Sequence, residues 1–399
     1  MANSHRRIVA GLVLTTLLFV IPARLGSPSI AQESSLSEPT RSGWTNVSSL
    51  PSPPPMAGAM MAYSSEANRF VLFGGWDGGR GLDSTWVYDP GNRSWRALHP
   101  DVSPIGRGDG MFVYDERTDQ FVLFGGWHED ANAAYTRLND TWLFSLENIV
   151  WTERHPTVSP SARSDSQVAY EPLVGAVLLV GGFDGLAYLA DVWSYAPSTD
   201  TWSPRPATVA PPPRADGRMV YIDGQNRFIL FGGNDFSGPN YTFHHLADTW
   251  TYSWKANEWK GLPMQDGPSA RDYPMFAFDP VTKLAFLSGG YGNGTILNDL
   301  WAFDTASDAW VDFSTTSSPP PRFAASGGFD RADHVLVLFS GLGNKGLLAD
   351  TWHYASQLQS ETSGLISPIV VVGVGALVAG LAVAIAVGLP RNKRSRELP

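Results

Sequence analysis

The feature that most constrains the fold of this 399-residue chain is a sequence block that recurs six times with constant internal spacing. In each copy a Leu lies four residues before a Trp, and in five copies a second Trp lies nine residues after the first. In five copies an Arg follows twelve residues after the second Trp, and a Gly follows nineteen residues after that Arg. Such repetition indicates an array in which each copy is one structural unit packed against its neighbours. The first Trp of the six copies is Trp86, Trp142, Trp193, Trp250, Trp301 and Trp352.

The last copy lacks its second Trp, because Glu361 stands nine residues after Trp352. The same spacing, counted back from Gly75, reaches Met56 after nineteen residues and Trp44 after twelve more. Trp44 is therefore the missing residue, and the start of the chain supplies the final strand of the last copy. The second Trp of the six copies is Trp95, Trp151, Trp202, Trp259, Trp310 and Trp44.

Each copy predicts four short strands. Alternating apolar residues, apolar runs such as FVLF and the glycines between them are typical of strands joined by hairpins. Six four-stranded sheets around an axis form a propeller, and closing the ring protects the edges of the first and last sheets. We therefore predict an all-β fold in which residues 44–355 form a six-bladed β-propeller closed by an N-terminal strand. We expect the twelve repeated Trp side chains to pack between the blades.

The repeat resembles the kelch repeat, whose period is about 50 residues. The Gly pair, the Asp-x-Trp step and the Trp nine residues later carry the resemblance, with Met56 in place of Arg, Ser84 in place of Asp and Ser340 in place of Gly. The resemblance implies a kelch-type β-propeller. One kelch-like protein is a copper radical oxidase that acts on galactose, and its cofactor needs a Cys cross-linked to Tyr. This chain has no Cys, so we exclude that chemistry and expect the likeness to galactose oxidase in the fold only.

The N-terminal end predicts export. Arg6 and Arg7 precede an apolar run over residues 8–23. This order is typical of an export signal, so we interpret residues 1–31 as a signal peptide or a signal anchor. A linker over residues 32–43 leads to the repeats.

The C-terminal end predicts one membrane span. Residues 369–389 form a run of 21 residues without a charge, which is long enough to cross a bilayer, and a basic cluster follows it. We interpret 356–365 as a short stalk, 366–389 as a transmembrane helix and 390–399 as a basic cytoplasmic tail, with a buried core helix as the alternative. Positive residues stay on the cytoplasmic side, which predicts a single-pass protein of the cell membrane with its propeller on the extracytoplasmic side.

Small residues recur at every fourth position of this span. Such a pattern is typical of a general richness in Ala and Gly, and the alternative is a face that packs helix against helix in a homodimer. The residues are Ala376, Gly380, Ala384 and Gly388.

The spacing from the Gly to the next first Trp is the one spacing that varies. It is 11 residues in four copies, 16 in the second and 17 in the fourth, which makes long loops of residues 127–139 and 234–247. Insertions in one class of loop lie on one face of a propeller, often the binding face. Strand direction places these loops on the same face as the Arg-bearing connections between blades. Both ends of the propeller then lie on the opposite face, so we expect the face with the long loops to point away from the membrane.

Two kinds of charged residue recur on that face. The arginines either form ion pairs between blades or, with the aspartates, make a socket for an anionic or sugar ligand, because guanidinium groups suit carboxylates and phosphates. The arginines are Arg107, Arg163, Arg214, Arg271 and Arg322, and the aspartates two residues later are Asp109, Asp165 and Asp216.

Other candidate residues lie outside the repeat pattern. Trp76 and Trp127 either stack on sugar faces or pack at the rim. His128, His244 and His245 lie in the two long loops and are candidate binding residues. Together with Glu129 and Asp235 they make a metal conceivable, but loop His and Asp side chains are usually solvated, and we expect no metal and no cofactor.

These observations favour a binding module over an enzyme. The net charge of −10 argues against a nucleic-acid partner. We predict a membrane-tethered propeller whose outward face binds a glycan, an envelope polymer or a protein. The alternative is a propeller enzyme, an isomerase or hydrolase, that acts on sugar-type substrates.

Overall fold

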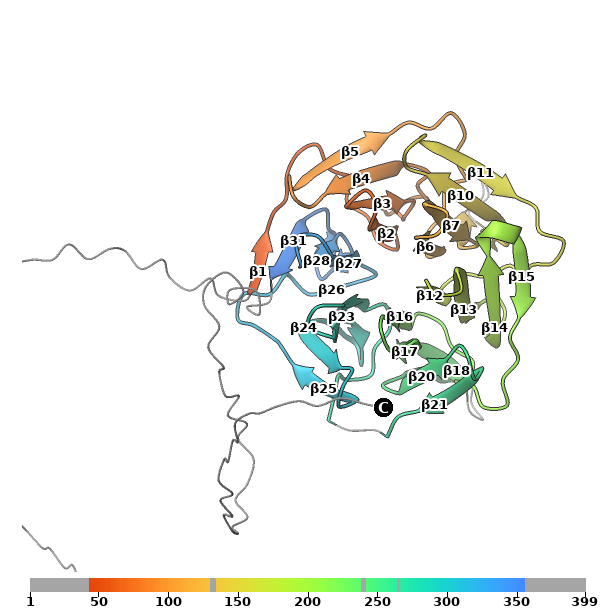
Figure 1. The fold of residues 1–399 in the computed structure, drawn as a ribbon. Coiled ribbons are helices and arrows are strands. Elements are labelled where there is room, and N and C mark those ends of the chain that lie inside the picture. Colours follow the sequence, from red (N-terminus) through yellow and green to blue (C-terminus); the bar gives the residue numbers. More distant parts are fainter. Residues whose placement is uncertain (1–42, 130–133, 238–241, 264–265, 356–399) are drawn as a thin grey trace, which may run out of the picture. The chain divides into compact units, whose positions relative to one another are not determined.

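The computed structural model describes residues 43–129, 134–237, 242–263 and 266–355. These residues form six antiparallel sheets of four strands each. Figure 1 shows the sheets arranged as a ring of blades, with first strands such as β2, β6 and β12 nearest the centre. The predicted six-bladed β-propeller is therefore confirmed.

The four strands of each blade follow one another from the axis outwards. Blade 1 contains β2 (Met60–Ser64), β3 (Arg69–Phe73), β4 (Thr85–Asp89) and β5 (Ser94–Leu98). Blade 2 contains β6 (Met111–Asp115), β7 (Gln120–Phe124), β10 (Thr141–Ser145) and β11 (Val150–Arg154). Blade 3 contains β12 (Gln167–Glu171), β13 (Ala176–Phe183), β14 (Tyr188–Ala196) and β15 (Thr201–Pro204). Blade 4 contains β16 (Arg218–Ile222), β17 (Arg227–Phe231), β20 (Thr249–Ser253) and β21 (Glu258–Gly261). Blade 5 contains β22 (Met275–Asp279), β23 (Leu284–Gly292), β24 (Thr295–Asp304) and β25 (Ala309–Asp312). Blade 6 contains β27 (Ser326–Asp330), β28 (Val335–Phe339), β31 (Thr351–Ala355) and β1 (Gly43–Asn46).

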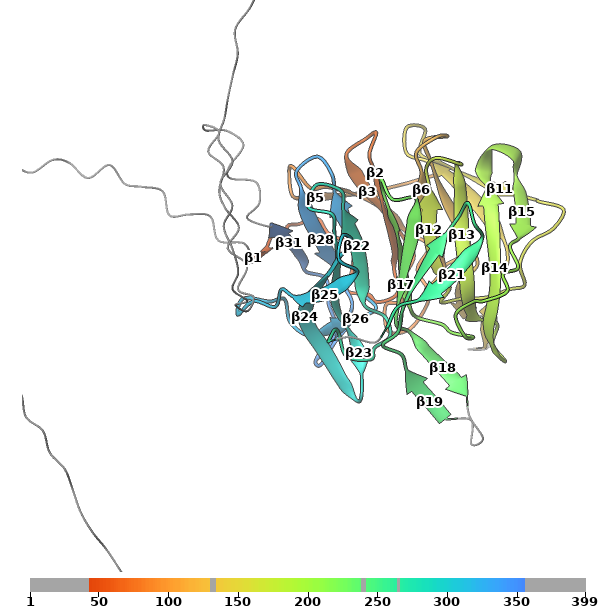
Figure 2. The same ribbon diagram turned by 60° about the horizontal axis from the view of Figure 1, so that its bottom comes forward.

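Short strands and one short helix lie in the connections between the main strands. The turn between β14 and β15 is the 3-10 helix η1 (Pro197–Thr199). The others all lie in connections on one face, which we call the loop face: β8 (Trp127–Glu129), β9 (Tyr135–Arg137), β18 (Asn234–Ser237), β19 (Thr242–His245), β26 (Arg322–Phe323), β29 (Leu342–Gly343) and β30 (Gly346–Leu347). Figure 2 shows the hairpin of β18 and β19 extending beyond the sheets.

The ring closes as the sequence predicts. Strand β1 pairs with β31, so that Trp44 faces Tyr354 and Gly43 faces Ala355. Ala355 also pairs with Val335, which begins β28 after the hairpin from β27. Both ends of the propeller therefore lie on the face opposite the loop face, as we expected.

The core consists of apolar clusters between neighbouring blades. Between blades 1 and 2, for example, Phe73 of β3 packs against Trp151 of β11 with ring centroids 4.8 Å apart. The Trp151 indole N–H also donates to the Thr85 hydroxyl of the preceding blade at 3.1 Å. Each of the six clusters combines residues of two adjacent blades in this way, which confirms that the repeated Trp side chains pack between blades.

The indole hydrogen bond is absent at two of the six junctions. The position before the first Trp is Thr in four blades, but it is Val192 in blade 3 and Leu300 in blade 5. The indole nitrogens that face these two positions, in Trp259 and Trp44, are buried and have no hydrogen-bond acceptor among the described residues.

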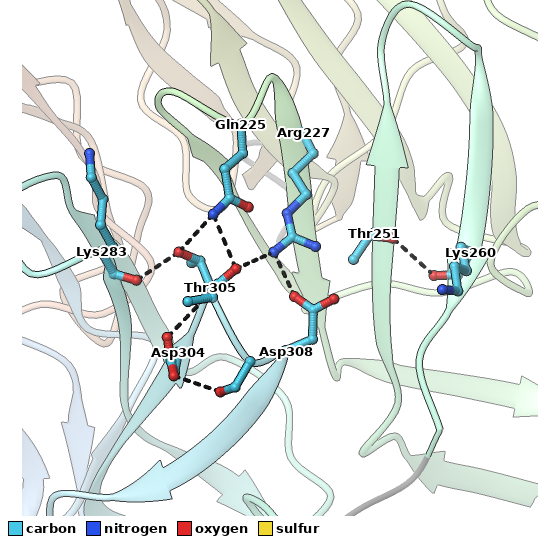
Figure 3. Close-up of polar contacts among 10 residues, drawn as sticks. Gln225, Arg227, Thr251, Lys260, Lys283, Asp304, Thr305 and Asp308 are labelled. Atoms are coloured by element: carbon cyan, nitrogen blue, oxygen red, sulfur yellow. Dashed lines mark hydrogen bonds and ion pairs between the residues drawn. The ribbon is translucent and has the colours of Figure 1, made fainter. Parts of the chain in front are cut away.

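Polar contacts also join the blades on the face opposite the loops. Figure 3 shows Gln225 and Arg227, at the turn from β16 to β17, reaching blade 5. Arg227 donates to Asp308 at 2.6 Å and to the Thr305 carbonyl at 2.8 Å. These contacts join adjacent blades at a place away from the axis of the propeller.

The part of the chain that the structure describes contains no helix long and apolar enough to cross a membrane. The expected signal segment over 1–31, the transmembrane helix over 366–389 and the basic tail over 390–399 all lie outside the described residues.

Candidate functional site at the propeller axis

The five repeated arginines are buried and form bidentate ion pairs. The guanidinium of Arg107 donates to the two carboxylate oxygens of Asp140 at 2.6 and 2.7 Å and to the Gly125 carbonyl at 3.0 Å. No more than 2% of any of the five arginines is exposed. The pairs are Arg107–Asp140, Arg163–Asp191, Arg214–Asp248, Arg271–Asp299 and Arg322–Asp350.

Each arginine joins two blades. The Arg107 side chain enters blade 2, while its backbone accepts from the Gly75 N–H and donates to the Leu82 carbonyl of blade 1. The ion pair itself lies within one blade, and the backbone makes the link to the preceding one. The arginines therefore do not form the open socket for an anionic or sugar ligand that the sequence suggested, because their guanidinium groups are buried and already bonded.

In four of these pairs the aspartate has a lowered pKa. Burial raises the pKa of the Asp140 carboxyl, but the Arg107 guanidinium and the Trp142 indole N–H outweigh it, so the pKa lies below its usual range. The same causes lower the pKa of three further aspartates, Asp191, Asp248 and Asp350.

Blade 1 lacks this pair altogether. Met56 occupies the arginine position and is fully buried, and Ser84 occupies the aspartate position. The Ser84 hydroxyl and the Trp86 indole nitrogen are both buried without a partner among the described residues. The two departures from the repeat are thus the two halves of one missing ion pair.

Next to the arginines, six residues form a ring around the axis. Each of these residues has a positive φ, between 49 and 63°. Each also donates its backbone N–H to the carbonyl of the corresponding residue of the preceding blade. Asp and Gly tolerate this left-handed conformation better than other residues. The ring members are Gly58, Asp109, Asp165, Asp216, Tyr273 and Ala324.

The ring brings together the three predicted aspartates. The hydroxyl of Tyr273 in blade 5 donates to Asp165 of blade 3 at 3.2 Å, so side chains of non-adjacent blades meet inside the ring. The Ser164 hydroxyl donates to the other Asp165 oxygen at 2.5 Å. Burial, followed by the Asp165 charge, raises the pKa of Asp109 to about 7.

Asp216 of the ring lies close to a further carboxyl group, that of Asp272. The Asn234 amide donates to Asp216 at 2.6 Å and to Asp272 at 2.9 Å, and the His245 ring nitrogen lies 3.3 Å from Asp272. Burial is the largest cause that raises the pKa of both carboxyls. Burial and the Asp216 charge also raise the pKa of Tyr188 to about 12. The axis therefore carries four carboxyl groups in a mostly buried setting.

The other predicted residues divide between the axis and the rim. The Trp127 indole donates to Asp109 at 2.8 Å, so Trp127 belongs to the axial group. His128 contacts the Gly106 carbonyl at 2.8 Å, and His244 pairs with Asp235 at 3.0 Å on the exposed part of its hairpin. Trp76 lies on the loop face of blade 1, where its backbone pairs with two neighbouring segments and its side chain is partly buried.

No three His, Asp or Glu side chains within the described ranges come together in a way that would hold a metal ion.

Sequence reasoning missed several axial residues: Asn234, Asp272, Tyr273, Arg218 and Tyr188. Asp272 follows its arginine by one residue and not by two, so it falls outside the predicted Asp series. Arg218 lies outside the arginine series. Its guanidinium donates to the Gly217 carbonyl at 3.0 Å and sits over the Tyr273 ring, 5.8 Å from the centroid.

The loop face also carries exposed apolar side chains on three neighbouring blades. We call the following four residues the loop-face patch: Tyr135 of β9 in blade 2, Leu186 of the turn in blade 3, and Phe236 and Phe243 of the hairpin in blade 4. Their exposed fractions are 58%, 94%, 50% and 47%, in that order.

Comparison with known proteins gives one family. A sequence model described as the KLHDC2/KLHL20/DRC7 kelch-repeats domain matches residues 26–210 and 203–362. An F-box/kelch-repeat protein of Arabidopsis thaliana is 31% identical over 206 residues, which cover 46% of this chain and 39% of that protein. Kelch-like protein 35 of Mus musculus is 24% identical over 269 residues, covering 66% and 41%. Kelch domain-containing protein 10 of Xenopus tropicalis is 25% identical over 193 residues, covering 46% and 45%. The chain thus spans less than half the length of these relatives.

Proposed function

Because this chain belongs to the kelch-repeat family of β-propellers, we propose that it is a membrane-tethered binding module that holds a protein partner on its loop face. Kelch repeats generally mediate protein interaction. The observation that carries the proposal is the loop-face patch, in which large apolar side chains are exposed on three neighbouring blades. Exposed apolar groups of this kind, aromatic ones above all, mark protein interaction sites.

The position of the two ends of the propeller supports the tethered arrangement. Gly43 and Ala355 pair with each other on the face opposite the loops. The apolar run over 369–389 follows soon after Ala355 in the sequence. A membrane anchor there leaves the loop face pointing away from the bilayer, where a partner has access to the patch.

The test is capture of a partner from the membrane fraction of the producing cells with the full chain. The variant Tyr135→Ser/Phe236→Ser/Phe243→Ser removes the aromatic part of the patch. The matched control, Leu173→Ser/Val174→Ser/Val281→Ser, removes equally exposed apolar side chains from turns of the opposite face. We expect the first variant to lose the captured protein and the control to retain it.

Loss in the control alone would place binding on the opposite face and contradict the proposal. Capture that is abolished by glycosidases but survives proteolysis of the fraction would identify a glycan, and the choice of a protein partner would then be wrong.

One observation favours the enzyme alternative. Asp109 has a pKa of about 7 at the axis, which suits a general acid or base near neutral pH. Incubation with reducing sugars and sialic acids, followed by NMR, tests this alternative. Faster exchange between anomers that disappears in Asp109→Asn would support an isomerase.

A further inference from the structure

A cavity of 160 Å³ lies on the propeller axis, beside the ring of left-handed residues. All six blades contribute to its lining, from Gly58 in blade 1 to Gly327 in blade 6. A cavity of about 150 Å³ accommodates a molecule the size of benzene. The space therefore suits one small ligand and not a polymer or a folded partner.

Two opposite charges, Arg218 and Asp109, line this cavity without a direct ion pair, although the Arg218 charge acts to lower the Asp109 pKa. The Arg218 guanidinium bonds to one backbone carbonyl and contacts the Tyr273 ring, and no described residue forms an ion pair with it. Asp109 uses one carboxylate oxygen to accept from Trp127, and its other oxygen has no partner among the described residues. Asp165 adds a second carboxylate to the same wall.

An unpaired guanidinium and an unpaired carboxylate on one cavity are costly when solvent is partly excluded, unless a bound group satisfies them. A guanidinium takes a carboxylate through two parallel hydrogen bonds. A carboxylate binds an ammonium group through an ion pair. One molecule that carries both groups would satisfy both walls at once.

The remaining walls are apolar and adaptable. The apolar residues that line the cavity include Met60, Met219, Met275, Phe112 and Phe276. Thioether side chains adjust to irregular apolar shapes and contact aromatic rings favourably. A neighbouring hollow of 240 Å³ shares Met61, Phe112, Val113, Met219 and Gly327 with the cavity, so the two adjoin along the first strands. This hollow adds space beside the cavity for an apolar side chain.

We propose that the axial cavity binds a free α-amino acid with an apolar side chain. Its ammonium group contacts Asp109 and Asp165, its carboxylate contacts Arg218, and its side chain lies among the methionines. This site is separate from the loop-face patch and does not depend on a protein partner.

Calorimetric titration of the full chain, purified in mild detergent, tests the proposal. The probes are L-leucine, L-methionine and L-phenylalanine, together with 4-methylpentanoate, which lacks the ammonium group of leucine, and 3-methylbutylamine, which lacks its carboxylate. We expect at least one amino acid to bind at millimolar concentration or below. We expect either analogue of leucine to bind at least ~10-fold more weakly than leucine itself.

Variants then assign the two charged walls. Asp109→Asn should weaken binding of the amino acid and of the amine, whereas Arg218→Gln should weaken binding of the amino acid and of the carboxylic acid. Arg218→Lys should restore part of the affinity lost in Arg218→Gln. The matched control is Arg227→Gln in the same blade, because Arg227 pairs with Asp308 away from the cavity, and it should bind like the native chain.

Circular dichroism confirms that each variant is folded. Absence of binding by all three amino acids, or an amine that binds as tightly as leucine, would overturn the proposal. An equal loss of affinity in Arg227→Gln would overturn it as well, because the effect would then come from the blade and not from the cavity.

Discussion

At the scale of single residues, the repeated arginines are structural. Each is buried, bonds to a carbonyl of its own blade and forms a bidentate pair with an aspartate. Removing one partner of such a pair leaves a buried charge without compensation, which is far more costly than removing both. Blade 1 shows that both can be replaced together, since Met56 and Ser84 stand at the two positions.

Replacing one pair by the blade 1 residues tests this account. Asp248→Ser leaves Arg214 buried without its carboxylate and should lower the free energy of unfolding by about 3–5 kcal/mol. Arg214→Met should cost less, because the Asp248 side chain keeps 30% of its surface exposed to solvent. The double variant should be more stable than the sum of the single effects predicts, by at least about 1 kcal/mol. Urea unfolding of all four proteins measures this coupling, and strict additivity would contradict the account.

A single methyl-to-hydroxyl change tests the indole hydrogen bonds. In four blades a Thr hydroxyl accepts from the Trp of the next blade, and Val192 interrupts this pattern opposite Trp259. Val192→Thr supplies the missing acceptor and should leave the protein equally stable or stabilise it by up to about 1 kcal/mol.

The control is Val177→Thr, at a fully buried position of the neighbouring cluster. No indole N–H donates there, so this change should destabilise by about 1–3 kcal/mol. Equal losses in both variants, measured by thermal unfolding, would mean that the hydroxyl at position 192 does not reach Trp259.

At the scale of elements, the ring of left-handed residues joins the inner ends of the blades. At Gly58, φ is +62° and an added Cβ would lie 2.6 Å from a carboxylate oxygen of Asp109. Gly58→Ala should therefore displace the Asp109 side chain as well as strain the backbone. We expect a loss of about 1–3 kcal/mol in unfolding free energy, and a change in the fluorescence of Trp127, which bonds to Asp109.

Gly224→Ala isolates the backbone contribution. Its φ is +82°, and nothing lies within 4 Å of the added Cβ. It should cost about 1 kcal/mol and leave the Trp fluorescence unchanged. If the two alanine variants lose the same stability and neither alters the fluorescence, Gly58 does not position the Asp109 carboxyl.

The elements were largely predictable from the sequence, whereas the axial group was not. Constant spacing predicts the four strands per blade, the closing strand at Trp44 and the two long loops, because backbone pairing repeats in every copy. The Arg–Asp ion pairs are indicated more weakly in the sequence. The one indication is that a single copy of the repeat lacks both the Arg and the Asp. The contact of Asp272 with Asn234 and His245 depends on how the hairpin of β18 and β19 folds against the connection that carries Asp272, and the repeat spacing does not predict this contact.

At the scale of the whole molecule, the axial carboxyls link stability to pH. The Asp109 pKa of about 7 is above the value of about 3.9 for an unfolded chain, so the folded state binds more protons between these values. This contribution to stability is fully present below about pH 4 and is lost as the pH rises through about 7. Burial lowers the pKa of His353 to about 4. The contribution of His353 to stability therefore rises with pH between its folded and unfolded pKa values.

The Asp109→Asn variant separates the two effects, since both proteins contain His353. The unfolding free energy of the variant minus that of the native chain should rise from about pH 5 to about pH 8, by up to about 1.4 kcal/mol per pH unit. Thermal unfolding across this range measures the difference. A constant difference would contradict a raised pKa at Asp109.

We propose that the loop face binds a protein partner while the opposite face lies towards the membrane. The most direct test of this proposal places a photo-crosslinking residue at Tyr135 or Phe243, or at Leu173 on the opposite face, in the full chain expressed in the producing cells. We predict that the Tyr135 and Phe243 positions crosslink to one protein and that the Leu173 position does not. Crosslinking of that protein from Leu173 but from neither loop-face position would contradict the account.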